Sequence, residues 1–421
     1  MELKKYKLAD IAKIEISGVD KKTIEGETPV RLCNFVDVYY NWAITKEKAK
    51  SFMAASAKQT EINKCSIGKG MVAITKDSET RDDIGVATYI ADDFENVVLG
   101  YHCALITPNP AVVDGKYLNA FMHTRYIQKY FENNASGSGQ RYTLSNDTIG
   151  NIPVLLPSVE EQHTIGKVLA DIDRKIELNK QINDNLEAMA KQLYDYWFVQ
   201  FDFPNEEGKP YKSSGGAMAW NEKLKREIPQ GWHCGSLLDI AEYTNGLACQ
   251  KYRPTDNNKL PVIKIKEMHD GLSADTEWVK ADIPDDVKVF DGDVLFSWSA
   301  SLEVILWAYG NGGLNQHIFK VTSKNGYPRS FYFYQLIHYV GVFKQIAEAR
   351  KTTMGHITQD HLRQSTIALP PNVDIANKLE EKLCPIFDEI VKNNQEIMAL
   401  TKQRDELLPL LMNGQASVNS D

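Results

Sequence analysis

The sequence predicts an α/β (α+β) fold in which two homologous mixed α/β domains are joined by two long helices. Three observations lead to this prediction. The chain repeats itself with a period of about half its 421 residues. Each copy begins with short β-branched runs broken by Gly, Asn and Pro, which are typical of strands and turns. Each copy ends in a long stretch in which apolar residues recur every three or four positions, as on one face of a helix.

Length and composition limit the class of protein. A chain of 421 residues has room for two to four domains, and 43% hydrophobic with 25% charged residues is typical of a globular protein. No apolar run approaches the ~18 residues of a membrane helix, and the opening "MELKKYKLAD" lacks the apolar core of a signal peptide. The six cysteines stand singly, without a C-x-x-C pair, and we expect reduced thiols. These features predict a cytoplasmic protein with no membrane partner.

The repeat is clearest near the end of each copy. "LSNDTIGNIPVLLP" at 144–157 aligns without a gap with "ITQDHLRQSTIALP" at 357–370. Weaker matches lie upstream, where "LADIAK", "PVRLCN" and "GYHCAL" in the first copy resemble "LLDIAE", "PVIKIK" and "NQHIFK" in the second. The period is too long for a solenoid, so we expect two homologous domains, at 1–157 and 228–370.

A long helix is predicted after each domain. The apolar period changes after Pro157 and Pro370, and helices are expected from about 160 to 199 and from about 374 to 411. This predicts a first spacer helix within 158–200, a linker at 201–227, a second spacer helix within 371–413 and a tail at 414–421. At 1.5 Å per residue such a helix is ~60 Å long, more than a domain core needs, so it is expected to set the distance between the domains.

The two helices are expected to pack together as an antiparallel coiled coil, related by a pseudo-two-fold axis. Each has an apolar stripe that must be buried, and the nearest candidate is the other helix. Asn179 and Asn393 take matching positions near the two helix centres, where a polar residue fixes register. We expect these asparagines to meet; the alternative is that each faces solvent. The residues expected to pair the helices are Ile165, Ile172, Asn179, Leu186, Leu193, Leu379, Ile386, Asn393, Leu400 and Leu407.

Catalytic motifs are not found in the sequence. There is no P-loop, "GSGQRY" at 137–142 is an incomplete dinucleotide loop, and no cluster has metal-ligand spacing. His102 and His317 occupy equivalent positions, but neither has a Ser, Cys or carboxylate partner at a recognisable spacing, so a structural or DNA-facing role is favoured. The chain is therefore expected to catalyse nothing and to hold no cofactor or metal of its own.

Four segments carry a resemblance to a known family. They are the block "IPVLLPSVEEQHTIGKVLADIDRKIELNKQI", the linker "LYDYWFVQFDFP", the entry "REIPQGWHCGSLLDIAEYTNG" and the terminal "LLPLLMNGQ". Together they resemble the DNA specificity subunit of a type I restriction-modification system, over essentially the whole chain. The second copy departs from the pattern, because Glu161 and Gln162 have no counterpart there.

The resemblance implies separate roles for this chain and for its partner subunits. Each domain would read one half of a bipartite asymmetric site in double-stranded DNA. The helices would set the gap between the half-sites and dock two methyltransferase subunits, which carry S-adenosylmethionine and modify adenine N6. Restriction motor-nuclease subunits, which use ATP and Mg²⁺, would join them. The alternative is a stand-alone, repressor-like protein with two DNA-binding domains.

Loop chemistry nominates the residues that read DNA, because base edges and phosphates are bound by amide, aromatic, hydroxyl and cationic side chains. In the first domain the candidates are Arg31, Asn34, Tyr39, Tyr40, Asn41, Trp42, Lys46, Lys76, Arg81, Gln140, Arg141 and Tyr142. In the second domain they are Lys264, Lys266, His269, Trp298, Ser299, Gln316, His317, Arg350, Lys351, Thr352 and Thr353.

The charge distribution is compatible with this assignment. The net charge of −8 opposes DNA binding as a whole, but it is carried mostly by the predicted helices. Residues 159–200 have a net charge of −3 and residues 371–421 of −4, whereas 1–158 and 201–370 have 0 and −1. Each domain can therefore present a local basic face, and the acidic helices suit protein docking better than DNA.

Overall fold

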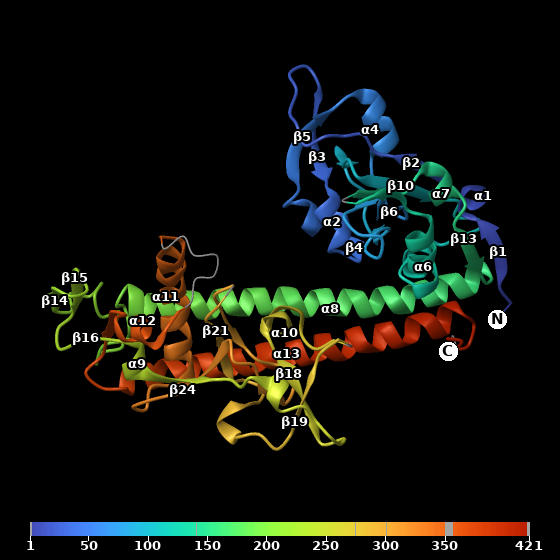
Figure 1. Ribbon diagram of the computed structural model, residues 1–421. Coiled ribbons are helices and arrows are strands. Elements are labelled where there is room, and N and C mark those ends of the chain that lie inside the picture. Colours follow the sequence, from blue (N-terminus) through green and yellow to red (C-terminus); the bar gives the residue numbers. More distant parts are fainter. Residues whose placement is uncertain (1, 140, 274, 300, 350–356, 419–421) are drawn as a thin grey trace. The chain divides into compact units, whose positions relative to one another are not determined.

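The computed structural model describes residues 2–139, 141–273, 275–299, 301–349 and 357–418 (Figure 1). It divides into two compact units, one of Met1–Ile176 with Leu400–Asp421 and the other of Glu177–Ala399. We call residues 2–157 the first domain and residues 228–370 the second domain. Each long helix crosses the boundary, so each unit holds one domain and a part of both helices.

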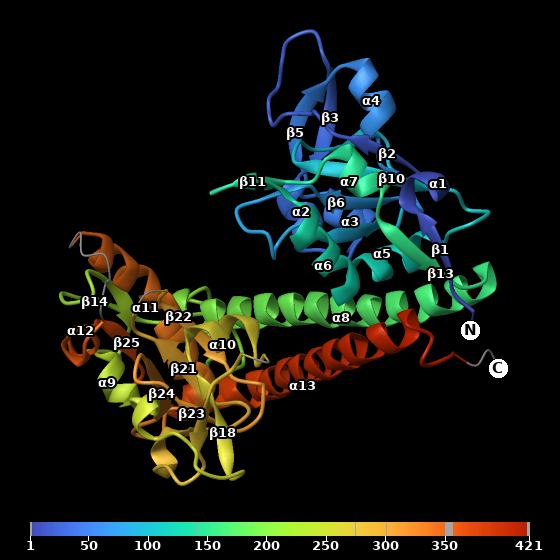
Figure 2. The ribbon, with the colours of Figure 1, turned by 45° about the vertical axis from the view of Figure 1, so that its right-hand side comes forward.

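Two main sheets form the first domain (Figure 2). The larger sheet has the order β2-β10-β6-β8-β4 and is antiparallel except for the parallel pair β4–β8. Its strands are β2 (Ala12–Ile16), β4 (Ala43–Ile44), β6 (Val72–Thr75), β8 (Ala87–Ile90) and β10 (Cys103–Pro108). The smaller sheet has the order β5-β3-β9, with strands β3 (Thr28–Cys33), β5 (Met53–Ala57) and β9 (Val97–Leu99). The apolar run of β6 is buried throughout, as a strand in the middle of a covered sheet requires.

Short elements complete the first domain. β1 (Lys4–Lys7) pairs with β13 (Pro153–Leu156), and β7 (Asp77–Ser78), β11 (Ser136–Ser138) and β12 (Arg141–Thr143) form a small sheet in the order β11-β12-β7. The helices are α1 (Leu8–Ile11), α2 (Phe35–Tyr39), α3 (Lys46–Ala49), α4 (Gln59–Cys65), α5 (Gly115–Met122), α6 (Arg125–Asn134) and α7 (Asn146–Gly150). Asp114, Thr124 and Ser145 begin α5, α6 and α7 by accepting a backbone N–H from the first turn.

Two four-stranded sheets form the second domain, in the orders β17-β24-β21-β22 and β19-β18-β23-β20. Their strands are β17 (Ala241–Asn245), β18 (Lys259–Ile263), β19 (Trp278–Lys280), β20 (Lys288–Val289), β21 (Val294–Ser297), β22 (Glu303–Leu306), β23 (Gly312–Leu314) and β24 (Ile318–Ser323). β16 (His233–Gly235) pairs with β25 (Ile367–Leu369), and β14 (Met218–Asn221) pairs with β15 (Arg226–Pro229) in the preceding linker. The helices are α9 (Leu237–Ile240), α10 (Ile265–Asp270), α11 (Arg329–Ala349) and α12 (Gln359–Arg363), with 3₁₀ turns at Cys249–Lys251 and Asp285–Val287.

The same topology appears in both domains, as the repeat predicts. The antiparallel series β2-β10-β6-β8 corresponds to β17-β24-β21-β22. The parallel pair β3–β9 corresponds to β18–β23, and the closing pair β1–β13 corresponds to β16–β25. The weak matches upstream are therefore real, because "PVRLCN" and "PVIKIK" supply β3 and β18, and "GYHCAL" and "NQHIFK" lead into β10 and β24.

Both long helices form as expected. α8 spans Val159–Tyr194 and continues into a π-helical turn at Asp195–Val199, and α13 spans Asp374–Met412 (Figure 1). The contacts between them have antiparallel order within each unit. In the unit of Glu177–Ala399, Asn183 meets Asn393 and Asn179 meets Glu396, and in the other unit Asp173 lies 3.8 Å from Arg404. The predicted meeting of Asn179 with Asn393 is wrong by one helical turn, because Asn183 takes that place.

The residues nominated for helix pairing lie on the inward side of the helices. Ile165, Leu379 and both asparagines are buried, and Ile172, Leu186, Leu193, Ile386, Leu400 and Leu407 are half-buried. Several of them also contact their domain. Ile165 belongs to the core of the first domain, and Leu379 belongs to that of the second. The apolar residues of each long helix therefore pack partly on the other helix and partly on a domain core.

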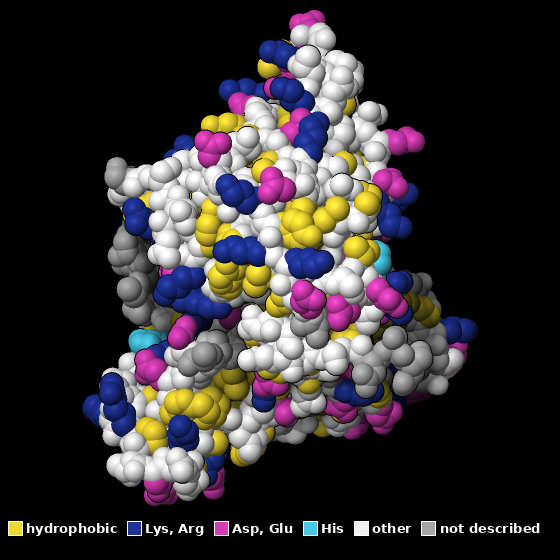
Figure 3. All heavy atoms as spheres, turned by 90° about the vertical axis from the view of Figure 1, so that its right-hand side faces the viewer, with side chains coloured by type: hydrophobic (Ala, Val, Ile, Leu, Met, Phe, Trp, Pro, Cys, Tyr) yellow, Lys and Arg dark blue, Asp and Glu magenta, His cyan; other side chains and the backbone are white. Residues whose placement is uncertain are grey.

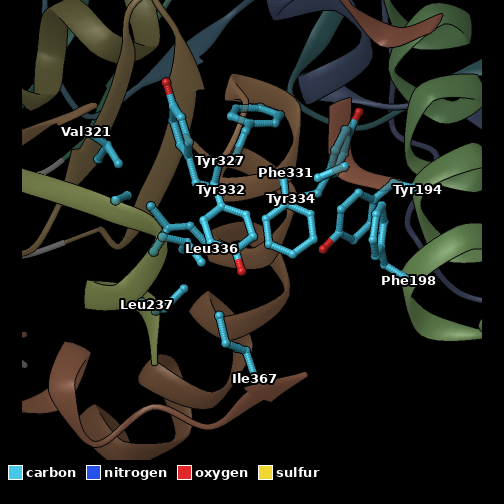
Figure 4. Packing of buried hydrophobic residues seen from close by; sticks show 14 of the residues in the cluster. Tyr194, Phe198, Leu237, Val321, Tyr327, Phe331, Tyr332, Tyr334, Leu336 and Ile367 are labelled. Atoms are coloured by element: carbon cyan, nitrogen blue, oxygen red, sulfur yellow. The ribbon is translucent and has the colours of Figure 1, made fainter. Parts of the chain in front are cut away.

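An aromatic core anchors α8 in the second unit. Tyr194 and Phe198 of α8 and its π-turn face Phe331 and Tyr334 of α11 (Figure 4). The ring centroids of Phe198 and Phe331 lie 4.8 Å apart in an edge-to-face arrangement, and those of Tyr194 and Tyr334 lie 5.0 Å apart. Such contacts between large buried rings fix the end of the helix firmly to the domain.

The first unit contains an equivalent anchor for α13. Leu408, Leu411 and Met412 at its end are buried in the same core as Ile165 and Leu169 of α8.

The six cysteines are free thiols, four of them buried. Within the described residues, no helix combines the length and the apolar character that crossing a membrane requires.

Candidate nucleic-acid interface

Both domains build one surface on the same backbone frame, at the end of β6 and of β21. The N–H of Lys76 donates to the carbonyl of His102 at 2.8 Å, and the N–H of Leu144 donates to the carbonyl of Lys76 at 2.8 Å. In the second domain Trp298 donates to His317 at 3.3 Å, and Ile357 donates to Trp298 at 3.0 Å. Lys76 is therefore equivalent to Trp298, and His102 is equivalent to His317, although their side chains differ.

A buried carboxylate organises this surface in the first domain. Oδ2 of Asp77 lies 2.9 Å from Nζ of Lys76, 2.6 Å from Nδ1 of His102 and 3.5 Å from Nη2 of Arg141. Burial raises the pKa of the Asp77 carboxyl, but hydrogen bonds from Thr143, His102 and Lys76 outweigh burial and bring the pKa to about 2. Asp77 is therefore ionised, and it holds three nitrogen-bearing side chains at one point of the surface.

Aromatic rings extend the same cluster. Nζ of Lys76 lies 5.4 Å from the ring centre of Tyr101, and the guanidinium of Arg81 lies 5.0 Å from that of Tyr142. The small sheet β11-β12-β7 places Arg141 and Tyr142 beside Asp77, and Figure 2 shows β11 at the edge of the domain. We call Lys76, Asp77, Arg81, His102, Arg141 and Tyr142 the first-domain cluster.

The equivalent surface of the second domain has other chemistry. Trp298 is half-buried against the core, with its ring 5.6 Å from that of the exposed His317, and Ser299 is buried. Nε2 of the half-buried Gln316 lies 3.3 Å from Nε2 of His317. An indole, an imidazole and an amide thus stand where the first domain has ammonium, carboxylate and imidazole groups.

Comparison with known proteins identifies the family. The model of the type I restriction modification DNA specificity domain matches residues 1–188 and again residues 229–402. The chain belongs to this family. The two matches correspond to the two copies that the repeat predicts. From here on, the first and second domains are called the first and second specificity domains.

Named relatives agree with this result. The MjaIX specificity subunit of Methanocaldococcus jannaschii is 28% identical over 324 residues, which are 74% of this chain and 71% of the relative. The HindI specificity subunit of Haemophilus influenzae is 24% identical over 403 residues, covering 80% of this chain and 85% of the relative. The crystal structure of an S subunit from M. genitalium shares the fold with a TM-score of 0.60 at 12% identity, covering 100% of this chain and 97% of that one.

Other nominated residues of the first specificity domain make hydrogen bonds within that domain. The N–H of Asn34, which is itself buried, donates to Asp37 at 2.7 Å to begin α2, and Nδ2 of Asn41 donates to the carbonyl of Asp37 at 2.8 Å. Nη1 of Arg31 donates to the carbonyls of Ala49 and Lys50. No hydrogen bond or ion pair between described side chains joins these residues to the first-domain cluster.

The remaining side chains of that region are more accessible. Tyr40 is 78% exposed, and Lys46 is exposed, with its N–H donating to Asp92. The hydroxyl of Tyr39 donates to Asp83 at 2.9 Å, and burial together with this carboxylate raises the pKa of Tyr39 to about 12. Tyr39 is therefore held against the loop that carries Arg81.

Trp42 lies in a stack between the first specificity domain and α13. Its ring lies 4.2 Å from that of the half-buried His123 at an interplanar angle of 16°, and the guanidinium of Arg404 lies 5.0 Å from the Trp42 ring centre. The sequence interpretation nominated Trp42 as a DNA reader, and this stays a prediction; the structure adds that the half-buried ring contacts α13.

The nominated cations of the second specificity domain are partly neutralised. Nζ of Lys264 lies 2.5 Å from Glu277, and Nδ1 of His269 lies 3.1 Å from Glu303. Lys266 is exposed. Gln140 and the group Arg350, Lys351, Thr352 and Thr353 lie outside the described residues.

Sequence reasoning missed several members of this interface. It found no carboxylate for His102, but Asp77 lies 2.6 Å away, brought there from 25 residues upstream. It also missed two cation–aromatic pairs at the antiparallel strands β18 and β19, Lys259 with Trp278 at 4.4 Å and Lys280 with Tyr252, which precedes β18, at 5.5 Å. The segment "TEWVK" places Trp278 and Lys280 two residues apart, whereas the positive φ of His102, 74°, has no sequence signal.

Gln162, which has no counterpart in the second copy, has an internal role. Its Nε2 donates to the carbonyls of Val112 at 3.1 Å and Pro157 at 3.0 Å, and its Oε1 accepts the N–H of Asp114 at 2.9 Å. The side chain is buried, so it ties the start of α8 to the loop before α5.

The arrangement brings polar groups of several chemical kinds to one surface. Hydroxyl, imidazole, ammonium and guanidinium groups converge with a carboxylate, which is the donor and acceptor set that reads base edges and phosphates. Figure 3 shows Lys and Arg side chains in small groups among acidic and apolar ones, without one continuous basic patch on the face that it displays. Within the described residues, no group of three or more His, Cys, Asp or Glu is placed to hold a metal ion.

Proposed function

We propose that this chain targets a type I restriction-modification complex to DNA and performs no catalysis itself. Each specificity domain reads one half of a bipartite asymmetric site in double-stranded DNA. The helices α8 and α13 set the distance between the halves. The chain works in the cytoplasm with two methyltransferase subunits, which bind S-adenosylmethionine and modify adenine N6, and with ATP- and Mg²⁺-dependent restriction subunits.

The main observation behind this proposal is that both domains repeat the same backbone hydrogen bonds at this surface but present different side chains. Lys76 and Trp298 make the same two backbone hydrogen bonds, so the fold at this point does not depend on which side chain is present. Asp77 and Ser299 follow them in the same way. A surface whose frame repeats while its chemistry changes is what two readers of two different half-sites require.

The chemistry of the first-domain cluster suits a nucleic acid. Lys76 and Arg81 supply positive charge for phosphates, and Tyr101 and Tyr142 supply aromatic faces beside it. The side chain of Arg141 is 60% exposed, so it can reach a groove. Asp77 keeps these groups in place without neutralising the cluster, because one carboxylate faces several nitrogen groups.

The helices suit protein partners. Leu178, Ile182 and Met189 of α8 are 53%, 37% and 58% exposed, and their spacing of four and seven residues places them on one face. An exposed apolar stripe of this kind marks a docking surface. We call these three residues the α8 stripe and propose that a methyltransferase subunit covers it.

The proposal is tested by expressing the chain with the methyltransferase subunit of its own system and sequencing the methylated adenines. We expect co-purification of the two proteins and methylation at a two-part motif with a fixed gap. Lys76→Ala with Arg81→Ala should weaken methylation at that motif, whereas Lys64→Ala with Lys69→Ala, a charge-matched pair in the same domain, should not. Methylation without a motif would overturn the proposal. Tight motif binding by a chain that never joins a methyltransferase would favour the repressor-like alternative.

A further inference from the structure

We propose that Arg141 is a guanine-binding residue for one half-site and that Asp77 is the residue that positions it. This inference rests on the proposed function and goes beyond it, because it assigns a base to a named side chain. It concerns the first specificity domain alone.

The guanidinium of Arg141 is anchored at one end only. Nη2 lies 3.5 Å from Oδ2 of Asp77 and 2.9 Å from Nδ1 of His102. Two lone pairs facing each other at 2.6 Å would repel, so Nδ1 of His102 carries the proton and donates to Oδ2 of Asp77. Nη2 of Arg141 then has no acceptor at Nδ1, and the carboxylate charge at 3.5 Å is what holds the guanidinium. Among the described residues, no acceptor is bonded to Nε or Nη1, and Nη2 keeps a second N–H, so one edge of the guanidinium still offers two parallel donors.

The anchor reduces the entropy that binding must overcome. A free arginine side chain loses about 2 kcal/mol of rotamer entropy when it is fixed, whereas a guanidinium already held by a carboxylate loses less. Asp77 itself cannot be the reader, because its side chain is only 9% exposed. Its depressed pKa, about 2, means that the anchoring charge is present at every pH at which DNA is stable.

The anchor is not a requirement of the fold. The second specificity domain has the same backbone frame, but Ser299 stands at the position of Asp77 and Trp298 at that of Lys76. The strand-end geometry therefore forms without a carboxylate. The first domain therefore has this combination for recognition and not for folding; its members are Lys76, Asp77, His102 and Arg141.

The donor pattern selects the base. Guanine presents two acceptors, O6 and N7, on its major-groove edge, and two parallel N–H groups of one guanidinium match them. Adenine places an amino donor beside N7, which would face another donor. A phosphate is a poorer partner here, because a second anion would lie close to the Asp77 carboxylate. Lys76 and Arg81, the other two basic residues of the first-domain cluster, remain for the phosphates.

The test measures the relative methylation of a library of half-site variants by the intact complex. The variants are Arg141→Lys and Asp77→Asn, with Arg125→Ala as a matched control. Arg125 is an exposed arginine of the same domain that also pairs with an acidic residue, Glu132 at 3.5 Å. Wild-type protein should require a G·C pair in the half-site that this domain reads. Arg141→Lys should reduce the preference for that pair by about ten-fold or more and leave the other half-site unchanged.

Asp77→Asn should reduce the preference at the same base pair by a smaller factor, because Arg141 remains but is no longer anchored. If this variant does not fold, Arg141→Lys still decides the question. An equal loss at every sequence would show a phosphate contact, and an unchanged preference would show no contact; either result overturns the inference. A wild-type complex with no two-part motif would instead overturn the proposed function.

Discussion

Nδ2 of Asn393 donates to Oδ1 of Asn183 at 2.9 Å, and both side chains are buried between α8 and α13. Asn179, one turn earlier, donates to Glu396 at 2.8 Å instead. The amides therefore form a polar layer inside a largely apolar contact. Such a layer fixes the register of the two helices, because any slip would leave buried amides without partners.

Asn183 and Asn393 should be coupled energetically. We expect Asn183→Ala and Asn393→Ala each to lower the free energy of unfolding by ~1–2 kcal/mol, because each leaves the other amide buried without that partner. The double variant should lose less than the two effects together. Urea denaturation of the four proteins of the cycle measures the coupling. Strict additivity for Asn183 and Asn393 would contradict the observed contact.

Protonation of His123 should make the first unit sensitive to acid. Burial lowers the pKa of His123 to about 4, from an ordinary value of 6.5, and the nearby Arg404 adds to the effect. Between these values the unfolded chain binds more protons than the folded one, so stability rises with pH and is lost as pH falls from about 6.5 to 4. The loss should reach about 3 kcal/mol.

The variant His123→Leu should flatten this dependence, because it has no group to protonate. His163→Gln, at an imidazole that is 62% exposed, is the control for replacing a histidine in the same unit. Denaturation midpoints between pH 4 and 7 measure both. An acid-sensitive profile that persists in His123→Leu would assign the effect to other groups.

Trp42 should contribute to stability through its stack with His123 and Arg404. Trp42→Ala removes a half-buried ring and both contacts, and we expect a loss of ~2–3 kcal/mol in the free energy of unfolding. Tyr40→Ala, two residues away at a side chain that is 78% exposed, should change stability by less than ~0.5 kcal/mol. Equal effects of the two substitutions would argue against the stack.

The α8 stripe should bind a methyltransferase subunit. Leu178→Asp with Ile182→Asp places two charges on the proposed contact and should weaken association by at least ~100-fold, because charged groups would be buried without partners. Ile24→Asp changes an apolar residue of equal exposure, 53%, in the first specificity domain and should leave association unchanged. Analytical ultracentrifugation of mixtures gives the dissociation constants. Normal assembly of the double variant would place the docking surface elsewhere.

The sequence predicted the features that depend on neighbours in the chain. Periodicity gave the two long helices, and the expected start at 374 is the first residue of α13. The repeat gave two domains of one topology, and short matches such as "PVRLCN" with "PVIKIK" marked equivalent strands correctly. These signals survive in a linear sequence because helix faces and strand runs are set by residues a few positions apart.

Tertiary structure decided the features that join distant residues. Asp77 meets His102 and Arg141 only because β7, β10 and β12 come together, and spacing in the chain does not encode that meeting. Asn393 meets Asn183 instead of Asn179, a pairing of residues 210 positions apart that a heptad count within each helix does not contain. Trp42 reads as a loop aromatic in the sequence and becomes part of a stack because Arg404, far along the chain, packs on it. The sequence by itself thus determined the parts and their repetition, whereas long-range packing determined which side chains each surface presents.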